Sequence, residues 1–312
     1  MPRPSSAAGA ALAALALAVA PLSPVAAADR PDTISLFTGS SPEGISAGPG
    51  TTFFAGARAD GAVYVGDVRE ATVRQLVPGR AGEVAVGLLY DAATKRIWVA
   101  GGPTGDITAY DSRTGAQLYT VNTGTGRFLN DVAITRDAVY VTDSTKNQIL
   151  VVPLGRGASL PATGTQPRVL TVGGDYVQPA GFGLNGIRVL PGGDLLAVSG
   201  GALYVIDPVT GIADRVEVSG LPGGRTSLTG GDGLELRGST LYVVRGFNPT
   251  ASVVVLRLGA GGRTATFVEE ITDNDFNVPT TAALVAGDLL VVNGQFNDPF
   301  TAPTEVVRID RP

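Results

Sequence analysis

A repeat of 43 to 55 residues runs along the chain after residue 30, and it limits the possible fold more than any other feature. Six short motifs mark it: Glu43-Gly44-Ile45, Val86-Gly87-Leu88, Asn130-Asp131-Val132, Asn185-Gly186-Ile187, Asp232-Gly233-Leu234 and Thr280-Thr281-Ala282. Each motif opens a short apolar run, and two further runs rich in Val, Leu, Ile and Tyr follow before the next motif. Because Gly, Pro, Asp and Asn separate these runs, the pattern predicts strands and turns without helices.

Repeats of this length with four strands each are typical of the blades of a β-propeller. Five units show a weaker fourth run, for example residues 72–77, 117–121 and 214–218, whereas the sixth ends after its third run. Residues 33–37 form an apolar run that precedes the first motif and belongs to no unit. We therefore expect an all-β, six-bladed propeller in which this N-terminal strand completes the last blade and closes the ring. A β-sandwich, or two, is the alternative, but it gives the motifs no reason to recur in register.

Residues 1–28 have the features of a secretory signal peptide. Arg3 supplies a positive charge, residues 7–20 are an unbroken run of small apolar residues, and Ala26-Ala27-Ala28 forms an A-x-A cleavage site. The apolar run is shorter than the roughly 20 residues that a membrane-spanning helix needs, and no later segment approaches that length. We expect an exported protein, secreted or periplasmic, whose mature chain, residues 29–312, is a monomeric propeller without a membrane span.

The composition excludes several classes of function. The 312 residues contain no Cys and no His, which removes disulfides, thiolate and Ser-His-Asp catalysis, thiolate or imidazole zinc sites and His-ligated haem. The net charge of −5 argues against a nucleic-acid partner, because such a partner needs a basic surface. No Gly-rich segment has the context of a nucleotide-binding loop. Carboxylates, amides, hydroxyls, Arg and a hard metal ion remain for chemistry on a small-molecule substrate.

The first residues of the six motifs form a column that a propeller would bring to its axis, because the innermost strand of each blade lines the central channel. The column reads Glu43, Val86, Asn130, Asn185, Asp232 and Thr280. Its two carboxylates and two amides form an oxygen-donor set that suits Ca²⁺ better than Mg²⁺, which keeps fewer protein ligands. The alternative is that the Asn-Gly and Asp-Gly pairs are turn formers only.

These residues resemble a known family. Glu in the first unit, Asn in the third, Asn-Gly in the fourth and Asp-Gly in the fifth are similar to the SMP-30/gluconolactonase/LRE-like family, and the same order resembles the calcium site of diisopropyl-fluorophosphatase-type phosphotriesterases. The resemblance covers about residues 33–310. It implies a six-bladed propeller with a catalytic cation, usually Ca²⁺, held by Glu43, Asn130, Asn185 and Asp232, and hydrolysis of lactones, esters or phosphotriesters.

The resemblance also implies roles and leaves alternatives open. Asp232 is the expected general base or nucleophile, and a water activated at the cation is the other candidate for the attack. Asp131 either contacts substrate or supports its neighbour. Val86 and Thr280 depart from more polar relatives and favour a more apolar ester or lactone. One competing function is a non-catalytic ligand- or protein-binding propeller with a structural Ca²⁺. Another is a metal-free condensing enzyme resembling strictosidine synthase, but the retained column of oxygen donors argues against it.

Overall fold

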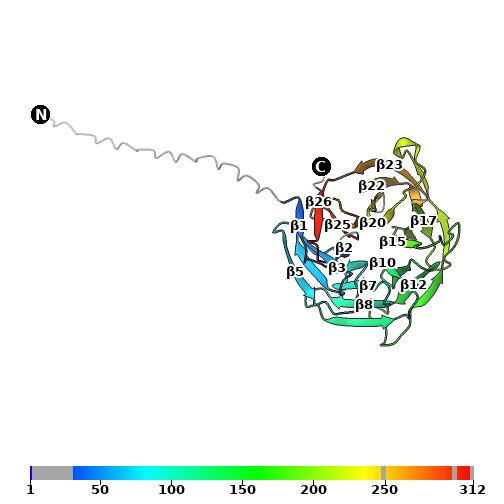
Figure 1. Cartoon of the computed structure of the whole chain (residues 1–312), viewed down its shortest axis with the longest axis horizontal. Coiled ribbons are helices and arrows are strands. Elements are labelled where there is room, and N and C mark those ends of the chain that lie inside the picture. Colours follow the sequence, from blue (N-terminus) through cyan, green and yellow to red (C-terminus); the bar gives the residue numbers. More distant parts are fainter. Residues whose placement is uncertain (2–30, 247–250, 297–300, 310–312) are drawn as a thin grey trace. The chain divides into compact units, whose positions relative to one another are not determined.

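Six small sheets stand around a central axis, and the strands at the inner ends of the sheets are β2 (Pro42–Ala47), β6 (Leu88–Asp91), β10 (Leu129–Ile134), β15 (Leu184–Val189), β20 (Gly231–Arg237) and β24 (Pro279–Val285) (Figure 1). The computed structural model describes Met1 and residues 31–246, 251–296 and 301–309. The chain from Pro31 onward forms one compact unit, and the predicted all-β, six-bladed propeller is confirmed. No α-helix, and so no membrane-crossing helix, is found among these residues. The predicted signal peptide, residues 1–28, lies outside them apart from Met1.

The first three blades are antiparallel and four-stranded. Blade one consists of β2 (Pro42–Ala47), β3 (Thr52–Ala57), β4 (Val63–Asp67) and β5 (Thr72–Val77). Blade two consists of β6 (Leu88–Asp91), β7 (Arg96–Ala100), β8 (Asp106–Asp111) and β9 (Gln117–Asn122). Blade three consists of β10 (Leu129–Ile134), β11 (Ala138–Asp143), β12 (Gln148–Pro153) and β13 (Arg168–Thr171).

Blades four and five each have a fifth, parallel strand on the outer edge. Blade four consists of β15 (Leu184–Val189), β16 (Leu195–Ser199), β17 (Ala202–Ile206) and β18 (Ile212–Arg215), with β14 (Gly173–Gly174) beside β18. Blade five consists of β20 (Gly231–Arg237), β21 (Thr240–Arg245), β22 (Ser252–Leu258) and β23 (Thr264–Ile271), with β19 (Glu217–Ser219) beside β23. Two short 3₁₀ turns, η1 (Pro222–Gly224) and η2 (Ala260–Gly262), complete the elements.

The single strand predicted over residues 214–218 is in fact shared between two blades. Strand β18 ends at Arg215, and the N–H of the next residue, Val216, donates to the Leu203 carbonyl of blade four at 2.9 Å. The next N–H, of Glu217, donates to the Arg263 carbonyl at 3.0 Å and starts β19 on the edge of blade five. The sequence, Asp-Arg-Val-Glu-Val, is compatible with a single strand, because it does not record which neighbour accepts the hydrogen bonds.

Blade six closes the ring as predicted. Its strands β24 (Pro279–Val285), β25 (Asp288–Asn293) and β26 (Glu305–Ile309) are joined on the outside by β1 (Thr33–Ser35), and Ile34 pairs with Val306. The contact continues beyond β1, since the hydroxyls of Ser40 and Thr304 lie 2.7 Å apart. The outer edge of the last blade is therefore covered by the beginning of the propeller, which protects it from pairing with other chains.

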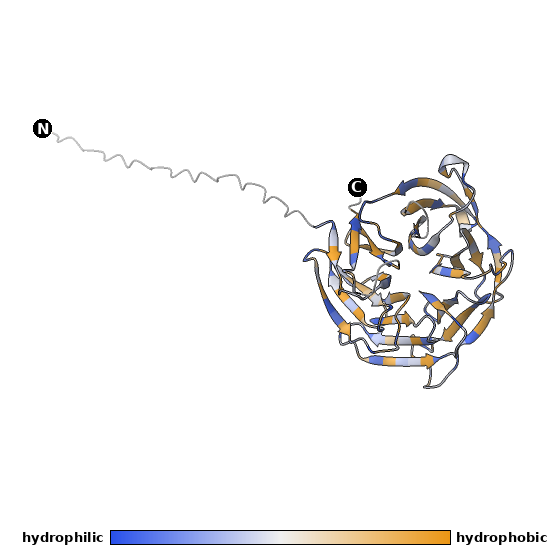
Figure 2. Ribbon diagram, viewed as in Figure 1, coloured by the Kyte–Doolittle hydropathy of each residue, from blue (hydrophilic) through white to orange (hydrophobic). Residues whose placement is uncertain are grey.

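The hydrophobic core lies between neighbouring blades. Strands alternate their side chains between two faces, and each face packs on the next blade, so the inner and middle strands are apolar on both sides. Trp98 on β7, fully buried, packs with Leu129 and Val139 of blade three. Figure 2 shows the hydrophobic residues along these strands and more hydrophilic residues on outer strands such as β5.

Glycines after the column residues allow the inner strands to approach closely. A Cβ atom on Gly44, Gly186 or Gly233 would lie 2.5 to 2.6 Å from a carbonyl oxygen of the next blade's motif. None of these three has a positive φ, so the lack of space, rather than backbone conformation, requires glycine. The Asn185-Gly186 and Asp232-Gly233 pairs lie within β15 and β20, so the turn interpretation of these pairs is wrong.

Candidate functional site

A pocket of about 640 Å³ lies at one end of the central axis and is lined by five of the six column residues. These five are Glu43, Val86, Asn130, Asn185 and Asp232. Thr280, the sixth, is not among its lining residues. The pocket size is within the range of small-molecule sites. The structure thus brings together all four predicted donors, which come from four different blades.

A bulge lies in each of the four inner strands that carry a donor. The pairing of the first and second strands shifts register between Pro42 and Ile45 in blade one, and equivalent shifts occur in blades three, four and five. A bulge places two residues opposite one and re-aims a side chain that a regular strand would point at a neighbouring blade. The same shift occurs in blade six between Pro279 and Thr281, where Thr280 does not line the pocket. The bulges therefore contribute to the placement of Glu43, Asn130, Asn185 and Asp232 but do not decide it alone.

The two carboxylates of the pocket are buried, and each has a raised pKa. Glu43 and Asp232 are 5% and 2% exposed. Burial, followed by the negative charges of Asp232 and Asp131, raises the pKa of Glu43 well above its ordinary value, and Arg58 opposes this. Burial also raises the pKa of Asp232 to about 7, although a hydrogen bond from the Asn185 side chain lowers it. A bound cation would compensate both charges.

The amide of Asn130 is held by a defined hydrogen-bond chain. Its Nδ2 donates to Ser144 Oγ at 3.0 Å, and that hydroxyl donates to the Leu184 carbonyl at 2.6 Å. Because the nitrogen is committed to Ser144, the carbonyl oxygen Oδ1 is the atom that Asn130 can offer to a ligand. Asn185 is oriented in the same way by its hydrogen bond to Asp232.

Arg58 is a pocket residue that the sequence reasoning missed. It follows β3, and its guanidinium carbon lies 4.1 Å from the ring centroid of Phe296, another lining residue. Burial lowers the pKa of Arg58, while the charges of Glu43 and Asp232 raise it, so the guanidinium and the carboxylates act on one another across the pocket. The pocket therefore contains its own positive charge beside two negative ones.

An aromatic rim also escaped prediction. Phe128 and Phe182 meet edge to face with ring centroids 4.8 Å apart, and Phe182 is 58% exposed. The Phe128 N–H donates to the buried carboxylate of Asp143, which also accepts hydrogen bonds from Arg127 and Gln148. This carboxylate fixes the segment that carries Phe128. The rim makes the pocket mouth apolar above a floor of oxygen donors.

Thr280 and Val86 take different places around the axis. Thr280 donates its hydroxyl proton to the Glu43 carbonyl at 2.7 Å, so it joins blade six to blade one and is fully buried. Val86 lines the pocket and precedes β6, with its N–H bonded to the Ala100 carbonyl at 2.9 Å. Thr280 thus holds the backbone of Glu43 through a hydrogen bond, and Val86 adds apolar surface to the blade-two side of the pocket.

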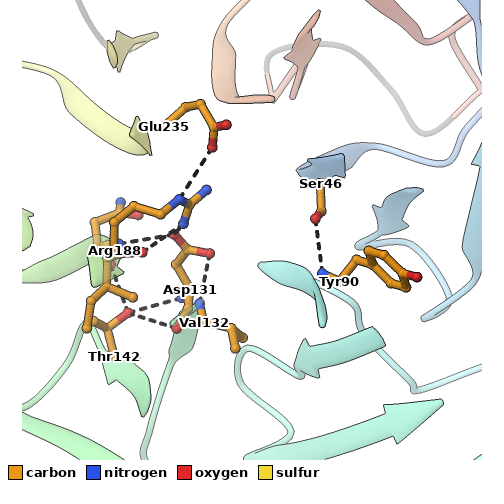
Figure 3. A network of polar contacts seen from close by, with 9 residues as sticks. Ser46, Tyr90, Asp131, Val132, Thr142, Arg188 and Glu235 are labelled. Atoms are coloured by element: carbon orange, nitrogen blue, oxygen red, sulfur yellow. Dashed lines mark hydrogen bonds and ion pairs between the residues drawn. The ribbon is translucent and has the colours of Figure 1, made fainter. Parts of the chain in front are cut away.

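Asp131 belongs to a buried ionic network beside the pocket (Figure 3). Its Oδ2 accepts hydrogen bonds from Arg188 Nη1 at 2.9 Å and from the Ile187 N–H at 3.1 Å. Arg188 also lies 3.6 Å from Glu235 on the next blade. The network ties blades three, four and five together, and the structure places Asp131 in this framework rather than among the residues that line the pocket.

The carboxylates alone do not make a metal cluster. Among the described residues, no three Asp, Glu, His or Cys side chains gather where they could hold one ion. Any cation in the pocket would therefore depend on amide oxygens in addition to Glu43 and Asp232. The predicted set has this composition, and oxygen donors of both kinds are ordinary ligands of Ca²⁺.

The comparisons with known proteins identify the fold. No family model and no curated protein matches the chain. Among solved structures, the allergen Mala s 1 of Malassezia sympodialis is similar at 17% identity and a TM-score of 0.66, over 90% of this chain and 96% of the other. A protein from Lactobacillus plantarum is similar at 18% identity and a TM-score of 0.54, over 81% of this chain and 77% of the other. A streptogramin B lyase is similar at 12% identity and a TM-score of 0.55, over 89% of this chain and 97% of the other. At these identities, the likeness shows the propeller fold alone.

Replacing Asp232 should stabilise the cation-free protein at alkaline pH. The raised pKa means that the folded protein retains a proton on Asp232 that the unfolded chain releases, so stability falls as the pH rises from about 4 to about 7. In EGTA, we expect Asp232→Asn to raise the free energy of unfolding by about 2 to 3 kcal/mol at pH 8 and by less at pH 5. Urea denaturation at the two pH values measures this. The exposed Asp137→Asn is the control, and equal effects of Asp232→Asn at both pH values would contradict the assignment.

Proposed function

We propose that this chain is a Ca²⁺-dependent hydrolase of the SMP-30/gluconolactonase/LRE-like kind, acting on lactones, esters or phosphotriesters with an apolar body. The observation that carries the proposal is the meeting of Glu43, Asn130, Asn185 and Asp232, from four blades, in one pocket. Propellers serve many functions, so the pocket residues, and not the fold, support this choice.

The donor set passes a simple test of fit for a hard divalent cation. Two buried carboxylates with raised pKa values need positive charge nearby, and the amide of Asn130 is turned so that its oxygen is available. Glu43, Asn130, Asn185 and Asp232 would hold the ion. Bound there, Ca²⁺ would supply Lewis-acid polarisation of a carbonyl or phosphoryl oxygen.

Asp232 is the residue that we assign to the reaction itself. Its carboxylate lies in the pocket, is buried and is oriented by a hydrogen bond from Asn185. It can take a proton from an attacking water or attack the substrate directly. Phe128 and Phe182 at the mouth limit access of bulk water and favour apolar substrates.

A turnover screen tests the proposal. The purified protein is assayed with a lactone, an aryl ester and a phosphotriester, after dialysis against EGTA and again after addition of Ca²⁺. We expect turnover of at least one substrate, its loss in EGTA and its recovery with Ca²⁺. Unchanged turnover after EGTA dialysis would contradict the cation requirement.

The second candidate is a binding propeller without turnover, and Arg58 favours it. Its guanidinium provides a positive charge beside Glu43 and Asp232, which reduces the need for a catalytic cation. If Ca²⁺ raises the melting temperature but no substrate in the screen reacts, this candidate replaces the hydrolase.

A further inference from the structure

Arg58 is the only positively charged side chain among the described residues that line the central pocket. Its guanidinium stacks on Phe296, and no described carboxylate forms an ion pair with it. Stacking uses the face of the guanidinium and leaves the N–H groups at its edge for hydrogen bonds. An arginine held in this way, with its donors uncommitted inside a pocket, is arranged to bind a planar anion.

The charge of the pocket indicates how many negative charges a ligand should carry. Glu43 and Asp232 are negative and Arg58 is positive, so the side chains together carry one negative charge when ionised. A divalent cation on the donors would change this to one positive charge. Since uncompensated charge in a buried site is unfavourable, a ligand with a single negative charge matches the cation-bound pocket.

The remaining surface of the pocket describes the body of that ligand. Phe128 and Phe182 form the rim, Phe296 lies beneath Arg58, and Val86 lies on the blade-two side. These side chains offer apolar contact and no further charge. The ligand that fits therefore has an apolar body and one anionic end.

We propose that Arg58 is the specificity-determining residue of the pocket and that the ligand is a monocarboxylate with an apolar body, its carboxylate bound by the guanidinium. This inference rests on the proposed function for the charge of the cation, and it narrows the substrates to lactones or esters that also carry a free carboxylate. The carboxylate takes the two N–H groups at the edge of Arg58, and the body lies against Phe128 and Phe182.

A matched pair of probes tests the proposal by binding alone. The affinities of 4-phenylbutyrate and of its neutral amide, 4-phenylbutyramide, are measured by calorimetry with Ca²⁺ and in EGTA. With Ca²⁺, we expect the carboxylate to bind the unchanged protein about ten- to a hundredfold more tightly than the amide. Arg58→Gln should bind both probes alike, and Arg58→Lys should keep part of the preference, because it retains charge without the bidentate geometry.

Controls separate this outcome from misfolding and from failure of the proposed function. Arg69→Gln, an exposed arginine change, should leave the preference intact, and urea denaturation checks that both Arg58 variants are folded. Equal binding of the two probes by the unchanged protein, or a preference that survives Arg58→Gln, would overturn the inference even if Ca²⁺ supports turnover. If Ca²⁺ supports no turnover but the preference depends on Arg58, the hydrolase fails and the inference stands.

Discussion

Asp232→Asn is expected to lower turnover about a thousandfold or more and to weaken Ca²⁺ binding about a hundredfold, while the protein stays folded. The change keeps the shape of the side chain and its hydrogen bond with Asn185 but removes one of the two negative charges in the pocket. It also removes the group that we assign as base or nucleophile. Calorimetric titration with Ca²⁺ and steady-state kinetics on the best substrate of the screen measure the two losses.

Glu43→Gln separates binding from chemistry. Glu43 is the other buried carboxylate, and we expect its replacement to weaken Ca²⁺ binding to a similar extent. At saturating Ca²⁺, however, Glu43→Gln should recover much of its turnover, whereas Asp232→Asn should not. Exposed changes of the same chemistry, Asp137→Asn and Glu70→Gln, serve as controls. Full turnover of Asp232→Asn at saturating Ca²⁺ would remove Asp232 from the reaction.

Gly186→Val is expected to destabilise the fold by about 4 kcal/mol. A Cβ at this position would lie 2.5 Å from the Asp232 carbonyl oxygen and 2.8 Å from the Leu234 backbone nitrogen. Because both are backbone atoms of the next inner strand, the clash moves blade five away from blade four instead of turning a side chain. Urea denaturation, followed by circular dichroism, measures the effect.

Gly192→Val is the matched control, since Gly192 has no positive φ and a Cβ atom at this position would meet no other atom within 4 Å. Its substitution should change the free energy of unfolding by less than about 1 kcal/mol. If Gly186→Val were as mild as the control, the close approach of inner strands would not be the reason for glycine after the column residues.

The architecture could be predicted because blade repeats leave a periodic trace. A similar motif recurs at each inner strand, and the segment of residues 33–37, which belongs to no repeat, predicted the strand that pairs with the outer edge of β26. Strand sharing between blades could not be predicted, since the sequence of residues 214–218 is the same whichever edge accepts their hydrogen bonds. The short β14, Gly173–Gly174, has no side-chain pattern at all.

The candidate site was predictable in part. The position of Arg58 in the repeat is a sequence signal for a further pocket residue. The residue that follows the second strand of each blade is, in order, Arg58, Gly101, Ser144, Gly200, Gly246 and Gly294. Four glycines, a serine and one arginine form a second column close to the axis. Extending the repeat alignment by these positions would have marked Arg58 as the exception and Ser144 as a polar partner for Asn130.

Other pocket features depend on contacts that no column records. Phe128 and Phe182 come from segments before two different inner strands, and the backbone of Phe128 is held by a hydrogen bond to Asp143. Asp131 is adjacent to a donor in the sequence, yet its carboxylate turns to Arg188 on blade four. Both outcomes depend on long-range partners rather than on local spacing.

The pairing of β1 with β26 also affects how the molecule reaches its folded state. Ser40 and Thr304, which meet beside this pair, are 264 residues apart. Contacts of such separation form slowly, because the loop entropy must be lost before the contact contributes. The ring therefore closes late in folding, and until β1 docks, β26 presents an unpaired edge to other unfinished chains.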